Sequence, residues 1–149
     1  MTRTSPPMIP MMMPGTFKLA FANIQGLQNR VDSVVDFIEQ QNISIMILAE
    51  TWLRGNQAAP IRPTVVDMRM NSDSGGRYRG KGGLMVVTQP KYEIDISVVK
   101  EDKSGRWTQL TVHDITIVAA YFEPSCEVQE VIRFWKEMEV LSESTEVLY

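Results

Sequence analysis

The spacing of hydrophobic positions changes along the chain in a way that marks strands and helices in turn. Residues 18–23 and 44–49 are short apolar runs, and the second is almost unbroken, which is typical of a strand buried on both faces. Between them, apolar residues recur at helical spacing, at Val31, Val34, Val35 and Ile38. We therefore expect strand, helix and strand, with Asn29 as the helix N-cap.

Polar stretches and several short strands follow. The composition predicts a loop over 54–62, a strand over 65–70 and a glycine-rich, basic loop over 71–83. Four apolar runs separated by turn residues then predict a meander, over 84–88, 93–99, 106–112 and 115–121. Ser125 is the expected cap of a final amphipathic helix. Its apolar stripe is predicted at Val128, Val131, Ile132, Trp135 and Met138, and residues 146–149 look like the beginning of another strand.

This order of elements predicts an α/β fold, with a mixed β-sheet and helices on its outer face. The length of 149 residues, of which 44% are hydrophobic and 22% charged, is typical of one globular domain, which we expect over residues 17–149. Residues 1–16 hold four of the eight prolines and five of the ten methionines, so we expect a disordered leader there. All apolar runs are far shorter than the roughly 20 residues that cross a bilayer, so no membrane segment is predicted.

The distribution of charge and the cysteine content bear on nucleic-acid binding and on the cellular location of the protein. The net charge of -3 is unusual for a nucleic-acid enzyme, but residues 123–149 hold seven of the 18 acidic and two of the 15 basic residues. The remaining 11 acidic and 13 basic residues leave the bulk of the chain mildly basic. The lone Cys126 cannot form an internal disulfide, which favours a reducing, intracellular location, nuclear or cytoplasmic. We expect Cys126 to be inert, because no base lies near it in sequence.

Polar side chains follow the ends of predicted strands. Asn23 ends the first strand and Glu50 ends the second, and polar groups at the carboxyl ends of neighbouring strands suit metal and phosphate chemistry. Glu50 supplies a hard oxygen ligand for Mg²⁺, and the amide of Asn23 can contact a phosphoryl oxygen. Tyr121 ends a later strand, where a phenol can donate to developing phosphate charge. The plainer alternatives are a surface glutamate, a turn asparagine and a packed aromatic ring.

Two further features could serve function or structure. Arg77, Arg79 and Lys81 surround an aromatic residue in the glycine-rich loop, a combination that contacts phosphates without reading sequence, although a merely solvated loop fits equally well. His113 invites a general-base role, but it falls in the predicted turn between the strands 106–112 and 115–121. That turn lies on the order of 20 Å from Tyr121 at about 3.3 Å per residue, so we expect no catalytic role for His113.

Several short motifs resemble those of the endonuclease/exonuclease/phosphatase superfamily. These are the strand ending in Asn23 with Gly26 after it, the strand ending in Glu50-Thr-Trp-Leu53, the glycine pair after Lys81, and the apolar strand ending in Tyr121. The Thr-Trp-Leu after Glu50 is most similar to the endonuclease module of non-LTR retrotransposon polyproteins, which are reverse-transcriptase-associated. The resemblance covers residues 17–149. It departs at Gln25, where many members carry an acidic residue.

The resemblance implies the N-terminal half of a four-layer α/β sandwich and a magnesium-dependent phosphodiesterase, a DNA endonuclease. In that reading Glu50 holds Mg²⁺, or alternatively Mn²⁺, while Asn23 and Tyr121 are catalytic. DNA is the implied partner, without a membrane or a small-molecule cofactor.

The family's later motifs, a Gly-Asp-x-Asn strand and a closing Asp-His pair, do not occur in the sequence. We therefore expect a truncated, inactive domain that lacks its C-terminal half, with one apolar sheet face uncovered. The alternatives are a non-catalytic remnant that binds nucleic acid or a partner, and a phosphatase or phospholipase of the same superfamily.

Overall fold

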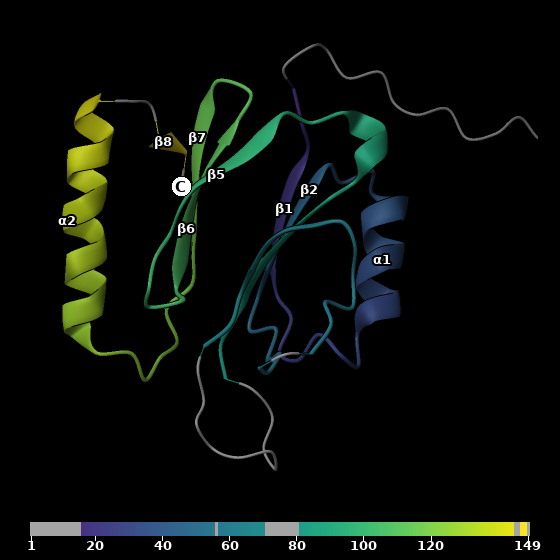
Figure 1. Cartoon of the computed structure of the whole chain (residues 1–149), viewed down its shortest axis with the longest axis horizontal. Coiled ribbons are helices and arrows are strands. Elements are labelled where there is room, and N and C mark those ends of the chain that lie inside the picture. The colour runs from purple at the N-terminus through teal and green to yellow at the C-terminus, as the bar shows by residue number, and fades with distance from the viewer. Residues whose placement is uncertain (1–15, 56, 71–80, 145–146, 149) are drawn as a thin grey trace, which may run out of the picture.

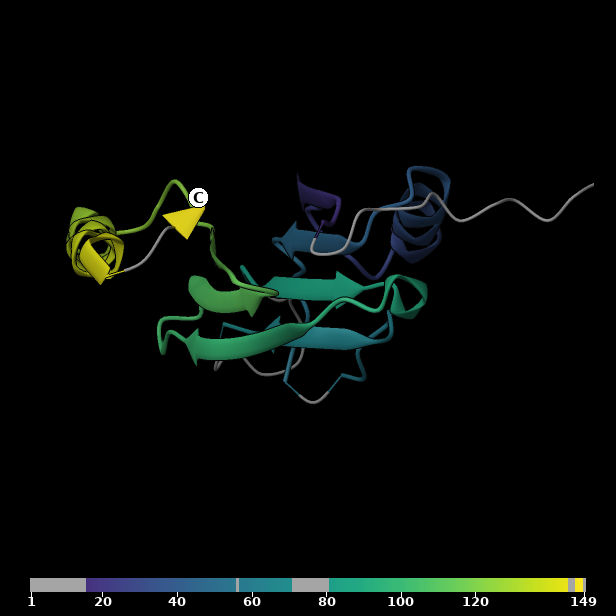
Figure 2. The ribbon, with the colours of Figure 1, turned by 90° about the horizontal axis from the view of Figure 1, so that it is seen from above.

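The chain folds into four layers, with two β-sheets between two helices. This computed structural model describes residues 16–55, 57–70, 81–144 and 147–148. Figure 1 shows helix α1 on the right, helix α2 on the left and the sheets between them, and Figure 2 shows the same order from above. The predicted α/β class, with helices on the outside, is confirmed.

The first sheet is mixed. Its strands lie in the order β1-β2-β4-β3, in which β1 and β2 are parallel and the other pairs antiparallel. The strands are β1 (Leu19–Asn23), β2 (Ile45–Ala49), β3 (Thr64–Met68) and β4 (Leu84–Thr88). Every residue of β2 is buried, as its continuous apolar run predicts.

The remaining strands form a second sheet in the order β5-β6-β7-β8, with β8 parallel to β7 and the rest antiparallel. The strands are β5 (Ile96–Glu101), β6 (Trp107–Val112), β7 (Ile115–Ala120) and β8 (Val147–Leu148). A short 3-10 helix, η1 (Pro90–Tyr92), lies between β4 and β5, and β5 begins three residues later than the predicted strand over 93–99. The proline of η1 sits in the first turn, where the missing N–H does no harm.

A shared core joins the two sheets. Side chains of β2, β3 and β4 meet those of β6 and β7, among them Ile47, Val86, Leu110 and Ile117. The two inner faces therefore cover each other, and the prediction of an uncovered apolar sheet face is wrong. The strands expected in one mixed sheet divide into two stacked sheets, which bury more apolar area than one open sheet can.

Helix α1 (Val31–Gln40) covers the outer face of the first sheet. Val34 and Ile38 are buried there, as their spacing predicts. The predicted cap at Asn29 is wrong, because Arg30 occupies the N-cap position and makes no side-chain cap hydrogen bond. The register of the apolar stripe, rather than a capping side chain, places this helix.

Helix α2 (Val128–Ser144) covers the second sheet through a stripe that shares Met138 with the predicted one and otherwise differs from it. Phe134 and Met138 are buried, whereas Val128, Ile132 and Trp135 are exposed by 69%, 44% and 52%. The helix is thus rotated away from the sequence-based stripe. It also begins three residues after Ser125, so that residue is not its N-cap.

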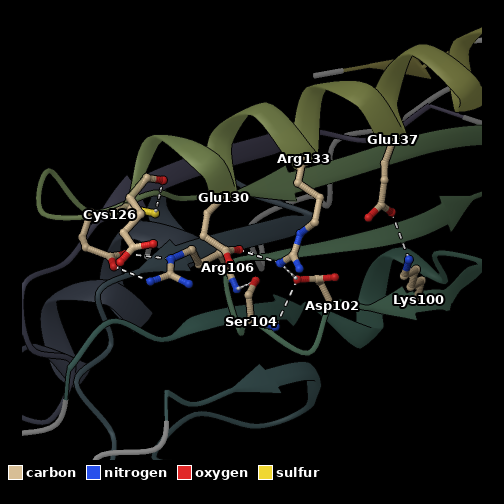
Figure 3. Close-up of polar contacts among 10 residues, drawn as sticks. Lys100, Asp102, Ser104, Arg106, Cys126, Glu130, Arg133 and Glu137 are labelled. Carbon is tan, nitrogen blue, oxygen red and sulfur yellow. Dashed lines mark hydrogen bonds and ion pairs between the residues drawn. The ribbon is translucent and has the colours of Figure 1, made fainter.

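Aromatic and charged contacts set that rotation. The ring of Phe134 packs edge-on against Trp107 and Phe122, at centroid distances of 5.7 and 5.2 Å. Beside this stripe, charged residues of α2 meet those of the β5–β6 hairpin (Figure 3). Glu137 pairs with Lys100 at 3.0 Å, and Arg133 lies 3.9 Å from the buried Asp102. Rotation of α2 toward the predicted stripe would separate these pairs.

No helix within the described ranges combines the length and the apolar character that crossing a membrane requires.

Candidate active site

The amide of Asn23 and the hydroxyl of Tyr121 meet across the two sheets. Asn23 is the last residue of β1, and Tyr121 directly follows β7. The Asn23 Nδ2 donates a hydrogen bond to the Tyr121 Oη over 3.1 Å. The backbone N–H of Tyr121 donates to the carbonyl of Arg106 at 2.9 Å, so β6 fixes the start of the loop that carries the phenol.

Glu50 reaches the same place from the end of β2. Its carboxylate lies close enough to Tyr121 for its negative charge to act on the phenol, and the residue is partly exposed. Three strand ends, from both sheets, therefore bring an amide, a carboxylate and a phenol together, as their positions in the sequence predict. What each side chain does there stays a prediction.

The phenol of Tyr121 is held in its protonated form. Burial raises the pKa of Tyr121 most, the neighbouring Glu50 carboxylate raises this pKa further, and the hydrogen bond from Asn23 opposes them. A protonated phenol donates through its O–H while its oxygen accepts from Asn23. The Asn23 amide thus donates to the phenol oxygen, and the Glu50 carboxylate acts on the same phenol through its charge.

A buried ion pair supports this end of the sandwich, and the sequence analysis missed it. Arg106 donates two hydrogen bonds to Glu123, at 2.6 and 3.2 Å, with side chains only 16% and 11% exposed. These bonds, more than any other contact, hold the pKa of Glu123 below its ordinary value. The signal in the sequence was weak, since it consisted only of an acidic residue two positions after Tyr121.

The remaining predicted residues separate into three groups. Lys81 is exposed, and its charge acts on Glu123, which places it on the side of the site. Arg77 and Arg79 lie outside the described residues. His113 occupies the β6–β7 turn with a φ of 53° and packs against Phe17 at a ring-centroid distance of 6.3 Å. The predicted turn position of His113 is confirmed, and it is the opposite end of β7 from Tyr121.

Cys126 has the character expected of an unreactive thiol. Burial, more than any other influence, raises the pKa of Cys126, and the nearby Arg106 opposes that rise without reversing it. The thiol donates to the backbone carbonyl of Glu127 at 3.5 Å. A thiol that keeps its proton is a poor nucleophile and a poor metal ligand.

The donor set at the strand ends suits a hard cation such as Mg²⁺, which takes one or two protein carboxylates and keeps several waters. Within the described ranges, no cluster of three or more His, Cys, Asp or Glu residues could hold a metal ion. Glu50 therefore lies beside the amide of Asn23 without belonging to such a cluster. That set fits an open magnesium site completed by water and substrate oxygens, and it does not fit a closed structural site.

Comparison with solved structures shows which known fold this chain resembles. No protein-family profile matches the sequence, and no curated protein matches it either. Among solved structures, the endonuclease domain of TRAS1, a telomere-specific non-LTR retrotransposon, aligns with a TM-score of 0.59 and 14% identity over 89% of this chain and 56% of its own.

Two apurinic/apyrimidinic (AP) endonucleases also align, each with a TM-score of 0.55. The enzyme from Archaeoglobus fulgidus shares 14% identity over 88% of this chain and 53% of its own, and the one from Leishmania major shares 16% over 79% and 44%. The chain thus spans about half the length of these structures. All three neighbours belong to the endonuclease/exonuclease/phosphatase superfamily, and the chain has a partial form of that superfamily's fold.

Proposed function

We propose that this chain forms part of a magnesium-dependent phosphodiesterase site that acts on DNA. The observation that carries the proposal is the meeting of Asn23, Glu50 and Tyr121 at one end of the sandwich, from three strand ends and both sheets. A carboxylate beside neutral hydrogen-bond donors is what a phosphate diester and its metal ion need in order to bind together. The nuclease folds of the aligned structures agree with this choice.

Glu50 is the proposed metal ligand, with Mg²⁺ as the ion and Mn²⁺ as its substitute. The ion would polarise a phosphoryl oxygen and offset the charge that builds up during displacement. Asn23 and the protonated Tyr121 are the proposed catalytic contacts, since both can donate to phosphoryl oxygens from fixed positions. Their mutual hydrogen bond orients both groups before a substrate arrives.

DNA is the proposed substrate, and the basic Lys81 near the site supports that choice. Lys81 is exposed on the side of Glu123, and Arg77 and Arg79 precede it closely in the sequence. Lysine and arginine contacts to phosphates supply affinity without sequence selectivity. The proposed interface therefore combines these residues with the three strand-end side chains.

We further propose that the 149-residue chain does not cleave DNA alone. Displacement at phosphorus needs a group that activates water, and the sequence has one histidine, His113, at the far end of β7 from Tyr121. The second candidate function is a non-catalytic nucleic-acid binder, and the position of the one histidine in the sequence, far from Tyr121, favours it as the state of this chain. The two proposals agree on DNA binding and differ on metal binding.

Metal binding by the purified chain tests the proposal. We expect Mn²⁺, followed by electron paramagnetic resonance, to bind one site, and Mg²⁺ to compete for it. Glu50→Gln should weaken that binding by on the order of tenfold or more, because it removes the charge and keeps the shape of the side chain.

Two variants serve as matched controls. Glu93→Gln removes an exposed carboxylate that also has a left-handed backbone, with a φ of 47°, at the opposite end of the first sheet. His113→Ala removes the histidine. Both should bind Mn²⁺ as the unaltered chain does. Equal Mn²⁺ affinity in the Glu50 and Glu93 variants would reject the metal role of Glu50 and leave the binder as the better proposal.

A further inference from the structure

The direction of the Glu50 side chain does not follow from the strand that precedes it. In β2 the odd-numbered side chains pack between the sheets, and the even-numbered ones pack under α1. Continued alternation would point residue 50 toward α1. The Glu50 carboxylate instead lies close enough to Tyr121, on the side of the second sheet, for its negative charge to act on the phenol.

Left-handed backbone explains the reversal. Glu50 has a φ of 55° and Trp52 a φ of 56°, a region that residues other than glycine adopt only where other contacts enforce it. Asparagine, aspartate and glycine are the usual residues there, and neither glutamate nor tryptophan belongs to that group. Something outside residues 50–52 must hold this conformation.

Backbone hydrogen bonds hold the segment from one side. The N–H of Glu50 donates to the carbonyl of Gly83, and the N–H of Trp52 donates to the carbonyl of Gly82, both at 2.9 Å. The glycine pair directly precedes β4, which is the neighbour of β2. The turn is therefore bonded to the strand start beside it.

The loop after β1 holds the segment from the other side. The N–H groups of Gly26 and Leu27 donate to the carbonyls of Glu50 and Thr51, at 2.9 and 3.0 Å. Thr51 sits between both sets of bonds and is 1% exposed. Within the described residues its Oγ1 has no hydrogen-bond partner, so the side chain is there for its shape and contacts.

The contact between Thr51 and Gly83 leaves no room for a side chain. A Cβ atom added to Gly83 would lie 2.2 Å from the Thr51 Oγ1, and the φ of Gly83 is 103°. To relieve this clash, an alanine at position 83 would have to move away from Thr51. Its carbonyl would then move away from the Glu50 N–H, because the backbone is closely packed there.

We propose that Thr51 and Gly83 are positioning residues for Glu50, because their close contact holds the left-handed turn that directs its carboxylate across the sandwich to Tyr121. This inference deepens the proposed site. It concerns only the direction of a side chain, so it is tested on metal-free protein without DNA, and its failure is distinct from the failure of the proposed function.

A double-mutant cycle between Glu50→Gln and Tyr121→Phe measures the contact that the turn creates. Each variant and the pair are unfolded in urea with a chelator present, and the non-additive shift of the midpoint reports the coupling. We expect measurable coupling in the unaltered chain and none in the Gly83→Ala background. A purely structural role for Gly83 would lower every midpoint and leave the coupling unchanged, which would overturn the proposal.

Gly55→Ala is the matched control. Gly55 also has a positive φ, of 43°, but an added Cβ would meet nothing within 4 Å, so the coupling should persist in that background. If Gly83→Ala does not fold, Thr51→Ala takes its place, since it removes the contact and leaves Gly83 with its φ of 103° unaltered. We then expect the coupling to be lost, and coupling that persists in the Thr51→Ala background would overturn the proposal.

Discussion

The side chain of Asn23 donates to the hydroxyl of Tyr121 at 3.1 Å, although the two residues lie 98 positions apart and belong to the ends of different sheets. The bond joins the first strand of one sheet to the loop that leaves the other. The relative placement of the two sheets therefore determines the site, and a change in their stacking would separate the two groups.

Cleavage assays address the proposed lack of activity directly. With Mg²⁺ or Mn²⁺, the purified 149-residue chain should not nick supercoiled plasmid above background, because the one histidine in the sequence, His113, lies at the far end of β7 from the site. Gel electrophoresis of relaxed and supercoiled forms gives the measurement. Metal-dependent nicking that Glu50→Ala abolishes would contradict the prediction, and it would show that the chain, alone or as a pair, completes the site.

The ion pair of Arg106 and Glu123 should make stability depend on pH. The pKa of Glu123 is lowered in the folded state, so its contribution is present above the unfolded pKa, about 4.5, and is lost as the pH falls through the folded value. We expect Glu123→Gln to lower the free energy of unfolding at pH 7 by about 2 kcal/mol and to flatten its decline in acid.

Urea unfolding at a series of pH values measures this dependence. Glu143→Gln, which alters an exposed residue of α2, should keep the acid decline of the unaltered chain. An equally steep decline in the Glu123 variant would mean that other carboxylates account for it.

Two adjacent aromatic residues of α2 should differ sharply in their effect on stability. Phe134→Ala removes a buried ring from contact with Trp107 and Phe122 and should lower the free energy of unfolding by about 3–5 kcal/mol. Trp135→Ala, at a side chain 52% exposed, should cost clearly less. Chemical denaturation of both variants compares them, and the reverse order would mean that α2 packs through the stripe that the sequence alone predicts.

The hydroxyl of Thr51, which has no partner among the described residues, leads us to predict that its removal does not lower stability. Thr51→Val keeps the shape of a fully buried side chain and removes a polar atom that has no partner among the described residues. The variant should therefore be as stable as the unaltered chain or more stable by about 1 kcal/mol. A clear loss of stability on thermal or urea unfolding would show that the hydroxyl is bonded in solution.

Local patterns in the sequence were sufficient for the elements and for the three strand-end residues. The helical spacing around Val34 and Ile38 predicted α1, and the unbroken apolar run predicted β2, because each period follows from the geometry of its own element. Asn23, Glu50 and Tyr121 could be found in the same way, since strand ends are visible as the points where apolar runs stop. The turn position of His113 followed from the same reading.

Contacts between distant residues decided the rest. Only the packed structure shows that the strands divide into two sheets, because the sequence of an apolar strand does not indicate which strands it pairs with or which sheet covers it. The rotation of α2 depends on Phe134 meeting Trp107, and its sequence allows more than one apolar stripe. The direction of Glu50 likewise depends on Gly83 and Thr51 lying in contact, which no local period reveals, because a left-handed glutamate is imposed by its surroundings rather than by its own preference.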